Sequence, residues 1–289
     1  MLLKPIGLAV TLFSLLLPSL YLSAENIDDQ TAATLPAQQG ELIWADLYSA
    51  DVSSSIKFYT KTFNWTVKKL GKPSSSYHIF YQNGQAVAGL LERSAKRNKT
   101  DKAVWIGSIY TQNVEKVVND AQKKGATIIL KPHEFDLFGT RAVMADPQGG
   151  IVAMLDVESK NKPRKKQSAN HWSWAQLFSV NTQEAANFYA KAFDYTIEDI
   201  TGREHAYYLS TQGQVQASVI KMPSDFPQRD RWVNFFEVVG VEGHVAKAVK
   251  NGAQVIYAST EQQLAIIADP NGAFIGLTEQ PDALALENK

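Results

Sequence analysis

The sequence Trp44-Ala-Asp-Leu-Tyr-Ser-Ala-Asp51 occurs a second time in the chain, as Trp174-Ala-Gln-Leu-Phe-Ser-Val-Asn181. The aromatic residues that follow keep the same spacing, because Phe63 recurs 130 positions later as Phe193, the displacement that also relates Trp44 to Trp174. A match that survives this distance without a gap indicates an internal duplication. The 289-residue chain is therefore expected to contain two similar domains.

Each copy of the repeat is typical of a strand followed by a helix. In residues 41–48, the side chains of Trp44, Asp46 and Tyr48 alternate with small and aliphatic ones, so the two sets should lie on opposite faces of a strand. The small, aliphatic face should pack against a helix capped by Asp51. The Phe-Tyr pair of that helix is expected to lie in the core rather than in a cofactor site.

Three short strands should follow each helix, which gives a βαβββ unit. In the first unit these are residues 65–70, 77–82 and 85–91, and Asn83-Gly84 is a hairpin turn. A second unit, beginning at residue 104, follows the first and has an Asp146-Pro-Gln-Gly149 turn before its last strand. Both units recur in the second half of the chain. The sequence thus predicts an α+β fold of four βαβββ modules, paired into two domains.

The segments outside these modules have different compositions. A positive start and an apolar run predict a signal peptide, and polar or basic stretches predict tethers. The predicted boundaries are a signal peptide at 1–24, a flexible spacer at 25–40, domain 1 at 41–157, a basic linker at 158–170, domain 2 at 171–280 and a C-terminal tail at 281–289.

The composition limits the classes of function. Lys plus Arg and Asp plus Glu number 29 each, so no overall charge favours nucleic acid or an anionic membrane, and no nucleic-acid partner is expected. The chain has no cysteine, which excludes disulfides and thiolate sites. The signal peptide predicts export to the periplasm or the medium, with no membrane span after cleavage; an uncleaved N-terminal anchor is the alternative. The oligomeric state is left open.

The repeated strand, the Phe-Tyr helix, the Gly125-Ala126 and Gly252-Ala253 helix ends and the Asp-Pro-x-Gly turns resemble the vicinal oxygen chelate superfamily. This superfamily includes glyoxalases, bleomycin resistance proteins and extradiol dioxygenases, and the closest similarity is to its tandem glyoxalase-like members. The resemblance covers residues 41–280. It implies paired modules whose sheets curve around a cleft, where His, Glu or Gln side chains usually hold a divalent metal.

The positions that correspond to the family's metal ligands carry other residues. They are Trp44, Gly89, Ile106 and Ala153 in the first half, and Trp174, Ser218, Val233 and Gly276 in the second. None is His, Glu or Gln, and neither an indole nor an aliphatic side chain binds a divalent ion. We therefore expect metal-independent binding, with no cofactor.

The candidate ligand-binding residues come from strand alternation and from the polar residues among the aromatic ones. They are Trp44, Asp46, Tyr48, His78, Trp105, Trp174, Gln176 and Asn234. Asp46 is the one candidate catalytic residue, as a general base or as an acceptor for a ligand, because a carboxylate between two aromatic side chains is costly to bury. The alternative is an ordinary bond from Asp46 to the backbone or to an arginine.

Two other features have both a functional and a structural interpretation. His78 and His205 take similar places on the third strands and suggest proton transfer or metal binding, but histidines among tyrosines are also common structural residues. Trp44 and Trp105 suit a flat stacking pocket, or they fill a closed core. His133 is expected in a loop.

Three functions are consistent with these features. The preferred one is an exported tandem glyoxalase-like protein that binds a small organic molecule in an aromatic-lined cleft. The first alternative is a lyase, isomerase or dioxygenase relative that uses Asp46, His78 or a non-standard metal site. The second is a structural or interaction protein whose own side chains fill both clefts. Whether the protein is an enzyme is left open.

Overall fold

The computed structural model describes residues 34–35, 37–70, 77–93, 102–135, 139–157, 164–165, 171–224, 226 and 228–279. The predicted signal peptide and the C-terminal tail lie outside these residues. The predicted spacer and linker are described only at 34–35, 37–40 and 164–165.

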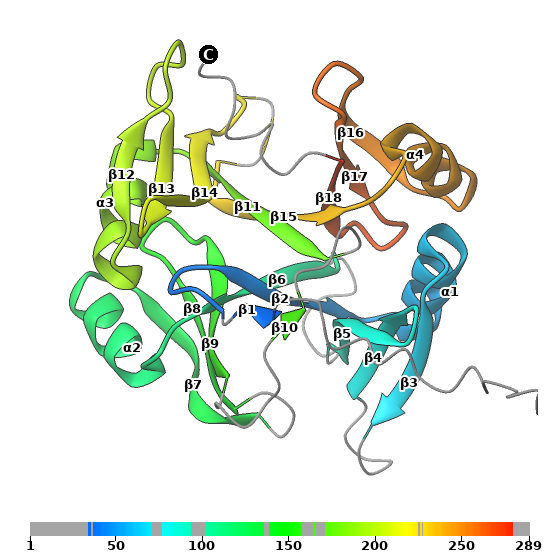
Figure 1. Ribbon diagram of the computed structural model, residues 1–289, viewed down its shortest axis with the longest axis horizontal. Coiled ribbons are helices and arrows are strands. Elements are labelled where there is room, and N and C mark those ends of the chain that lie inside the picture. Colours follow the sequence, from blue (N-terminus) through cyan, green and yellow to red (C-terminus); the bar gives the residue numbers. More distant parts are fainter. Residues whose placement is uncertain are drawn as a thin grey trace, which may run out of the picture. The chain divides into compact units, whose positions relative to one another are not determined.

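The first half of the chain forms one eight-stranded sheet from two βαβββ modules (Figure 1). The strand order is β3-β4-β5-β2-β6-β9-β8-β7. The first module consists of β2 (Leu42–Ser49), α1 (Val52–Phe63), β3 (Thr66–Leu70), β4 (Tyr77–Gln82) and β5 (Gln85–Glu92). The second consists of β6 (Val104–Tyr110), α2 (Val114–Lys123), β7 (Thr127–Phe135), β8 (Gly139–Ala145) and β9 (Ile151–Val157).

The second half repeats this arrangement in the strand order β12-β13-β14-β11-β15-β18-β17-β16. Its first module consists of β11 (Trp172–Ser179), α3 (Thr182–Phe193), β12 (Thr196–Asp199), β13 (Tyr207–Thr211) and β14 (Gln214–Lys221). Its second consists of β15 (Arg231–Glu237), α4 (Val241–Lys250), β16 (Gln254–Ser259), β17 (Leu264–Ala268) and β18 (Phe274–Thr278). The predicted fold class is confirmed. Two further short strands, β1 (Thr34–Leu35) and β10 (Arg164–Lys165), pair antiparallel.

The two faces of β2 have the predicted contents. Ala45 and Leu47 lie in the main hydrophobic core, whereas Trp44 lies in a separate cluster on the other face. Asp51 caps α1 by accepting a hydrogen bond from the Ser54 backbone N–H at 2.8 Å, because the first helical amides have no partner within the helix. The predicted core position of the Phe-Tyr pair of α1 is confirmed, since Phe58 and Tyr59 are buried in the main core.

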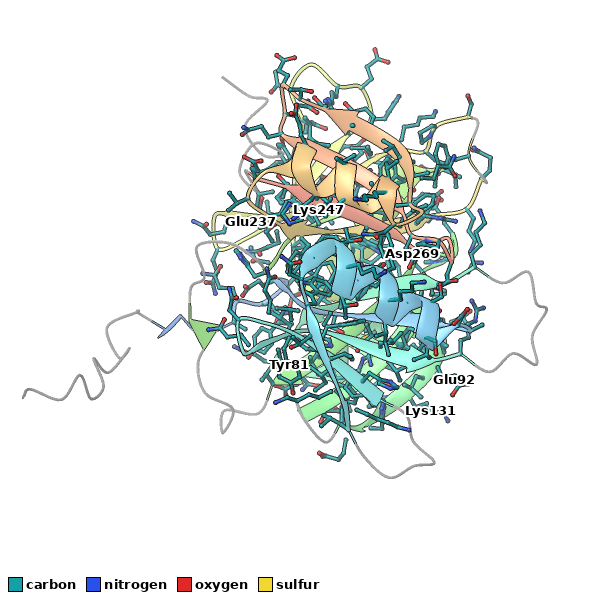
Figure 2. All side chains as sticks on the ribbon, turned by 90° about the vertical axis from the view of Figure 1, so that its right-hand side faces the viewer. Tyr81, Glu92, Lys131, Glu237, Lys247 and Asp269 are labelled. Carbon is teal, nitrogen blue, oxygen red and sulfur yellow. The ribbon has the colours of Figure 1, made fainter. Side chains whose placement is uncertain are left out.

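The main core is shared by both sheets and by the helices that cover them. Helix α1 lies beside α4, and α2 lies beside α3 (Figure 1). The Tyr59 hydroxyl donates to Asp269 Oδ2 at 3.0 Å and accepts from Trp105 Nε1 at 2.7 Å. Asp269 accordingly lies next to α1 in the side view of Figure 2.

The same hydrogen-bonded chain occurs at the equivalent place in the other half. The Tyr189 hydroxyl donates to Asp146 Oδ2 at 2.8 Å and accepts from Trp232 Nε1 at 2.8 Å. The two Asp-Pro-x-Gly turns therefore do more than reverse the chain. Each turn aspartate is bonded to a core tyrosine of the other domain, so the duplicated motif links the two domains.

Two predicted positions of histidines are wrong. His133 lies in β7, which is longer than expected and continues to Phe135, and not in a loop. His205 lies before β13 in an exposed turn with a positive φ of 54°, and the strand begins at Tyr207. By sheet register, His78 corresponds to Tyr207, because Ile79 pairs with Gly89 as Tyr208 pairs with Ser218.

None of the helices in the described parts of the chain is long and apolar enough to cross a membrane.

Candidate ligand-binding site

In the first domain, the sheet face opposite the helices is centred on Asp46. Its side chain is fully buried, and Arg141 Nη2 lies 2.8 Å from Asp46 Oδ2 in an equally buried ion pair. Asp46 Oδ1 accepts hydrogen bonds from the Tyr77 hydroxyl at 2.8 Å and from Trp44 Nε1 at 3.1 Å. The carboxylate is thus held by an arginine and two aromatic donors, which matches the structural alternative for Asp46.

The electrostatics of this face follow from the ion pair. Burial acts to lower the pKa of Arg141, but Asp46, Tyr48 and Tyr77 together outweigh it and the pKa is raised. Burial raises the pKa of Tyr77, and the Asp46 charge raises it further. Burial likewise raises the pKa of Tyr48, which hydrogen-bonds Arg141. The Arg141 guanidinium also stacks over the Phe135 ring, 5.1 Å from its centroid. These side chains fill the first cleft.

The second domain carries neutral residues at the equivalent positions. Sheet register identifies them, because Gln176 pairs with Ser218 as Asp46 pairs with Gly89. Leu264 takes the place of Arg141, since Leu264 pairs with Thr278 as Arg141 pairs with Leu155. Each lies five positions before the aspartate of its Asp-Pro-x-Gly turn. At the two remaining equivalent positions, the second domain has Phe178 where the first has Tyr48, and Ala206 where the first has Tyr77.

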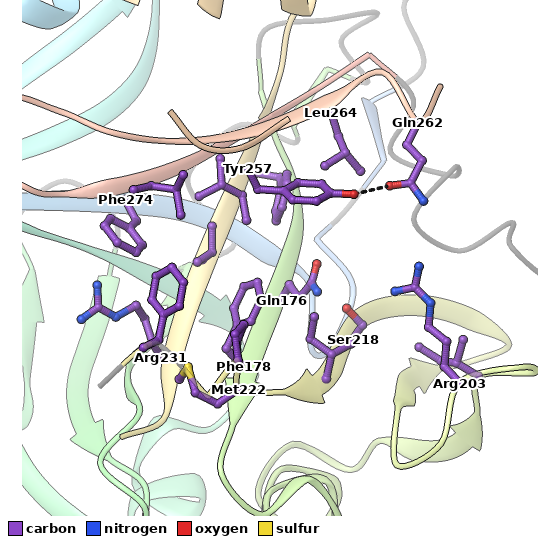
Figure 3. A pocket seen from close by; sticks show the side chains of 18 of the residues that line it. Gln176, Phe178, Arg203, Ser218, Met222, Arg231, Tyr257, Gln262, Leu264 and Phe274 are labelled. Atoms are coloured by element: carbon purple, nitrogen blue, oxygen red, sulfur yellow. Dashed lines mark hydrogen bonds between the residues drawn. The ribbon is translucent and has the colours of Figure 1, made fainter. Parts of the chain in front are cut away.

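These exchanges leave a cavity of about 320 Å³ in the second domain (Figure 3). Its walls are mainly aromatic and aliphatic, and include Phe178, Tyr208, Ile220, Phe226, Val233 and Phe235. Gln176 and Ser218 supply polar groups next to each other on neighbouring strands, and both are buried. Tyr257 and Gln262 face each other across one side, with the Tyr257 hydroxyl 3.5 Å from Gln262 Oε1.

The indole of Trp174 has no partner like that of Trp44. Trp174 lies on the same face as Gln176, is 3% exposed, and packs edge-on against Tyr208. Its Nε1 has no hydrogen-bond partner among the described residues, whereas Trp44 Nε1 donates to Asp46. An unpaired buried donor is costly, but Trp174 is not among the residues that line the cavity.

The structure therefore brings together some of the predicted site residues. Trp44, Asp46 and Tyr48 share the filled first cleft, and Trp174 and Gln176 share the face of the open second one. The contrast between Asp46 and Gln176 is apparent from the sequence. The sequence does not reveal that the Asp46 carboxylate is neutralised by Arg141.

Three predicted residues lie on the opposite faces of the sheets. His78 alternates with Ile79 and lies on the face of Phe80 and Leu90, which belong to the main core. Trp105 is buried between the domains and donates to Tyr59, so it forms no pocket with Trp44.

Asn234 is likewise misplaced in the prediction, because Val233 and Phe235 face the second cleft and Asn234 faces away. Its Oδ1 lies against Gly107 of the other domain, where a side chain would not fit. The error arose from assigning β15 the wrong parity.

Arg141 and Leu264 are the residues that sequence reasoning missed. A signal was available in the sequence. When the two Asp-Pro-x-Gly turns are aligned, Arg141 falls at the position of Leu264, so the first domain has a charged residue in an otherwise apolar strand. A charged residue in such a strand predicts a buried partner of opposite charge, and Asp46 is the acidic residue on the same face of the sheet.

The donor set does not fit the divalent metal that the fold class usually holds. In the described parts of the chain, no group of three or more His, Asp or Glu side chains is placed to hold a metal ion. The carboxylate nearest the expected position, Asp46, is occupied by Arg141, and in the second domain the central residues are Gln176 and Ser218. No step through a metal can be derived for these residues.

Paired βαβββ modules, each sheet with a face for a ligand, define the class of glyoxalase-like proteins. The model of the glyoxalase/bleomycin resistance protein/dioxygenase superfamily matches residues 41–154, and that of a glyoxalase-like domain matches residues 177–278. The chain belongs to this superfamily, as a protein with two glyoxalase-like domains.

Bacterial relatives match this chain over most of their own length. The putative glyoxylase CFP32 of Mycobacterium tuberculosis is 22% identical over 249 residues, which cover 83% of this chain and 95% of that protein. The anthracycline biosynthesis protein DnrV of Streptomyces peucetius is 23% identical over 262 residues, covering 83% and 93% of the two chains.

Solved structures share the fold at low sequence identity. The Mn(II)-bound glyoxalase from Novosphingobium aromaticivorans superposes with a TM-score of 0.56 at 10% identity, covering 85% of this chain and 83% of that one. An extradiol ring-cleaving dioxygenase from B. fuscum superposes with a TM-score of 0.58 at 12% identity, covering 87% and 76%. These similarities concern the fold alone.

Proposed function

We propose that this protein binds a small, largely apolar organic molecule in the cavity of its second domain, without a divalent metal. The supporting observation is the contrast between the two equivalent clefts. Asp46 and Arg141 fill the first, whereas Gln176 and Leu264 border an open space of about 320 Å³ in the second. Ligand pockets of this kind have mostly apolar walls and a few polar groups that orient the ligand.

The polar groups beside the cavity suit a neutral hydrogen-bonding portion of such a ligand. The Gln176 amide both donates and accepts, and Ser218 carries a hydroxyl. A hydrogen-bonding group on the ligand would pair with them, and the aromatic walls would bury the rest. The names of the Streptomyces relatives, which refer to anthracycline biosynthesis, also favour an organic small molecule as the ligand.

The alternatives have weaker support. A general-base role for Asp46 conflicts with its burial and with its pairing to Arg141, and His78 lies on the other face of the sheet. A wholly structural role fits the first domain, whose cleft is filled. It leaves the cavity of the second domain unexplained.

A fluorescent apolar probe tests the proposal. N-phenyl-1-naphthylamine, which is neutral and brightens in apolar surroundings, should bind the protein at one site per chain. Ile220 borders the cavity and is half-buried, so Ile220→Trp should fill the space and weaken binding tenfold or more, by about 1.4 kcal/mol. Leu91→Trp is the matched control, because Leu91 pairs with Tyr48 as Ile220 pairs with Phe178, and Leu91 is also half-buried.

Two outcomes would reject the proposal. One is the absence of probe binding to the wild-type protein. The other is equal binding by Ile220→Trp and Leu91→Trp, which would place the probe elsewhere. Binding should also raise the melting temperature of the wild-type protein, since a ligand of the native state stabilises it by mass action.

Metal independence and export are separate parts of the proposal. Elemental analysis of the purified protein should find no stoichiometric zinc, nickel, manganese or iron, and a stoichiometric metal would refute this part. Export rests on residues 1–24 of the sequence alone, which predict a periplasmic or secreted protein. Fractionation of cells that express the full chain, with the N-terminus of the exported product sequenced, tests it; a wholly cytoplasmic product would refute it.

A further inference from the structure

In each domain a strand carries an arginine on the ligand side of the sheet, and the two arginines, Arg141 and Arg231, are in different electrostatic situations. Arg141 in the first domain is neutralised by Asp46. Arg231 in the second stands at the start of β15, opposite Phe178, where the first domain has Val104 opposite Tyr48. The second domain has thus gained a cation at a place where the first has an aliphatic residue.

Arg231 has no acidic partner among the described residues. Its guanidinium lies over the Phe274 ring, 4.6 Å from the centroid, and it forms no ion pair with any residue that the structure describes. Burial lowers the pKa of Arg231, and the neighbouring Arg229 lowers it further. The adjacent carboxylate of Asp230 points elsewhere and accepts from the Val180 backbone N–H at 2.9 Å. A half-buried cation in this setting is stabilised by any anion that reaches it.

The remaining charges of the cavity have the same sign. Among the described lining residues, the two charged ones are Arg231 and Arg203, and no carboxylate lines the space. Figure 3 places them at opposite ends, with Arg231 near Phe274 and the exposed Arg203 near Gln262. Arg231 is packed against an aromatic wall of the cavity, the Phe274 ring.

We propose that the ligand of the second domain is an aromatic or otherwise apolar molecule with one anionic group, a carboxylate or sulfonate, and that Arg231 binds this group. The inference rests on the proposed function and names its ligand class. In the first domain the carboxylate of Asp46 pairs with Arg141. In the second domain the anionic group of the ligand takes this role and pairs with Arg231. A planar guanidinium suits two-point binding of such oxygen pairs.

Two probes with one carbon skeleton separate the charge from the apolar contact. 8-Anilinonaphthalene-1-sulfonate differs from N-phenyl-1-naphthylamine by its sulfonate. The wild-type protein should bind the sulfonate about tenfold more tightly, because a hydrogen bond to a charged group adds a favourable contribution of that order. Arg231→Gln should abolish this preference and leave the affinity for the neutral probe unchanged. Arg231→Lys should retain much of it, and Arg229→Gln is the surface control.

The outcomes distinguish this inference from the proposed function. If the neutral probe binds in a manner sensitive to Ile220→Trp but Arg231→Gln leaves the sulfonate affinity unchanged, the anionic ligand class is wrong and cavity binding stands. Equal weakening of both probes by Arg231→Gln would also overturn the inference, because it would show that Arg231 only packs against Phe274. If neither probe binds in the cavity, the proposed function fails and this inference fails with it.

Discussion

Arg141 and Asp46 form a buried ion pair, with Nη2 and Oδ2 2.8 Å apart, in the cleft that corresponds to the open cavity of the second domain. The pair is enclosed by Tyr77, Trp44 and Phe135. The duplicated fold thus carries a closed and an open version of the same cleft within one chain.

Removing one member of this pair should destabilise the protein strongly. Arg141→Leu leaves Asp46 buried and uncompensated, and we expect the free energy of unfolding to fall by about 3–5 kcal/mol. Asp46→Gln together with Arg141→Leu introduces the residues of the second domain and should restore most of the loss. Urea denaturation of both single variants and the double variant measures the coupling. Additive effects would contradict the pairing.

Gly89 should tolerate no side chain. A Cβ at this position would collide with Asp46 Oδ1 and the Tyr77 hydroxyl, whereas the equivalent residue Ser218 carries a side chain beside the cavity. Gly89→Ser should therefore lower the stability by about 1–3 kcal/mol through overpacking. Ser218→Gly is the matched change in the open domain and should cost less. A smaller loss for Gly89→Ser than for Ser218→Gly, by chemical denaturation, would show that the first cleft is not tightly filled.

The two tyrosines between the domains should contribute similarly to stability. Tyr59→Phe leaves Asp269 Oδ2 and Trp105 Nε1 without the hydroxyl that they share, at a cost of about 1–3 kcal/mol. Tyr189→Phe should cost a similar amount, because it breaks the equivalent bonds to Asp146 and Trp232. Thermal unfolding with Tyr81→Phe as the control tests this, since no hydrogen bond joins the Tyr81 hydroxyl to a described residue. Equality of all three variants would refute it.

Asp230 should make the stability fall between about pH 4 and pH 6. Burial raises its pKa to about 6, and the nearby Asp146 charge adds to the shift. An unfolded aspartate has a pKa of about 3.9, so the native state binds the extra proton in this interval and stability decreases as the pH rises. The contribution of Asp230 to the free energy of unfolding is fully present below about pH 4 and is lost above about pH 6. Asp230→Asn should flatten this part of the profile of unfolding free energy against pH.

The exposed Asp199 provides the control for this measurement. Asp199→Asn should leave the slope between pH 4 and pH 6 as in the wild-type protein. A slope that Asp230→Asn does not change would mean that another group, such as Asp146 or Asp269, whose pKa values are also raised by burial, dominates the interval.

Much of the fold can be predicted from local sequence, because it depends on patterns that recur. Alternation in β2, the Asp51 cap and the Asn83-Gly84 turn each predict the local geometry that the structure has. Which face of a strand meets the ligand is harder to predict where both faces are apolar. On β15, Trp232 and Val233 are both buried, so alternation does not show which of the two faces of the strand meets the cleft. The assignment of Asn234 to the cleft was wrong.

The sequence by itself determined the duplication and the four βαβββ modules, because both depend on residue type and spacing along the chain. The tertiary structure decided which cleft is open. Asp46 and Arg141 are 95 positions apart in sequence and meet only when β2, β6, β9 and β8 are assembled into one sheet. Charge neutralisation across that distance is a property of packing, and the same assembly leaves Arg231 without an acidic partner in the part of the chain that the structure describes.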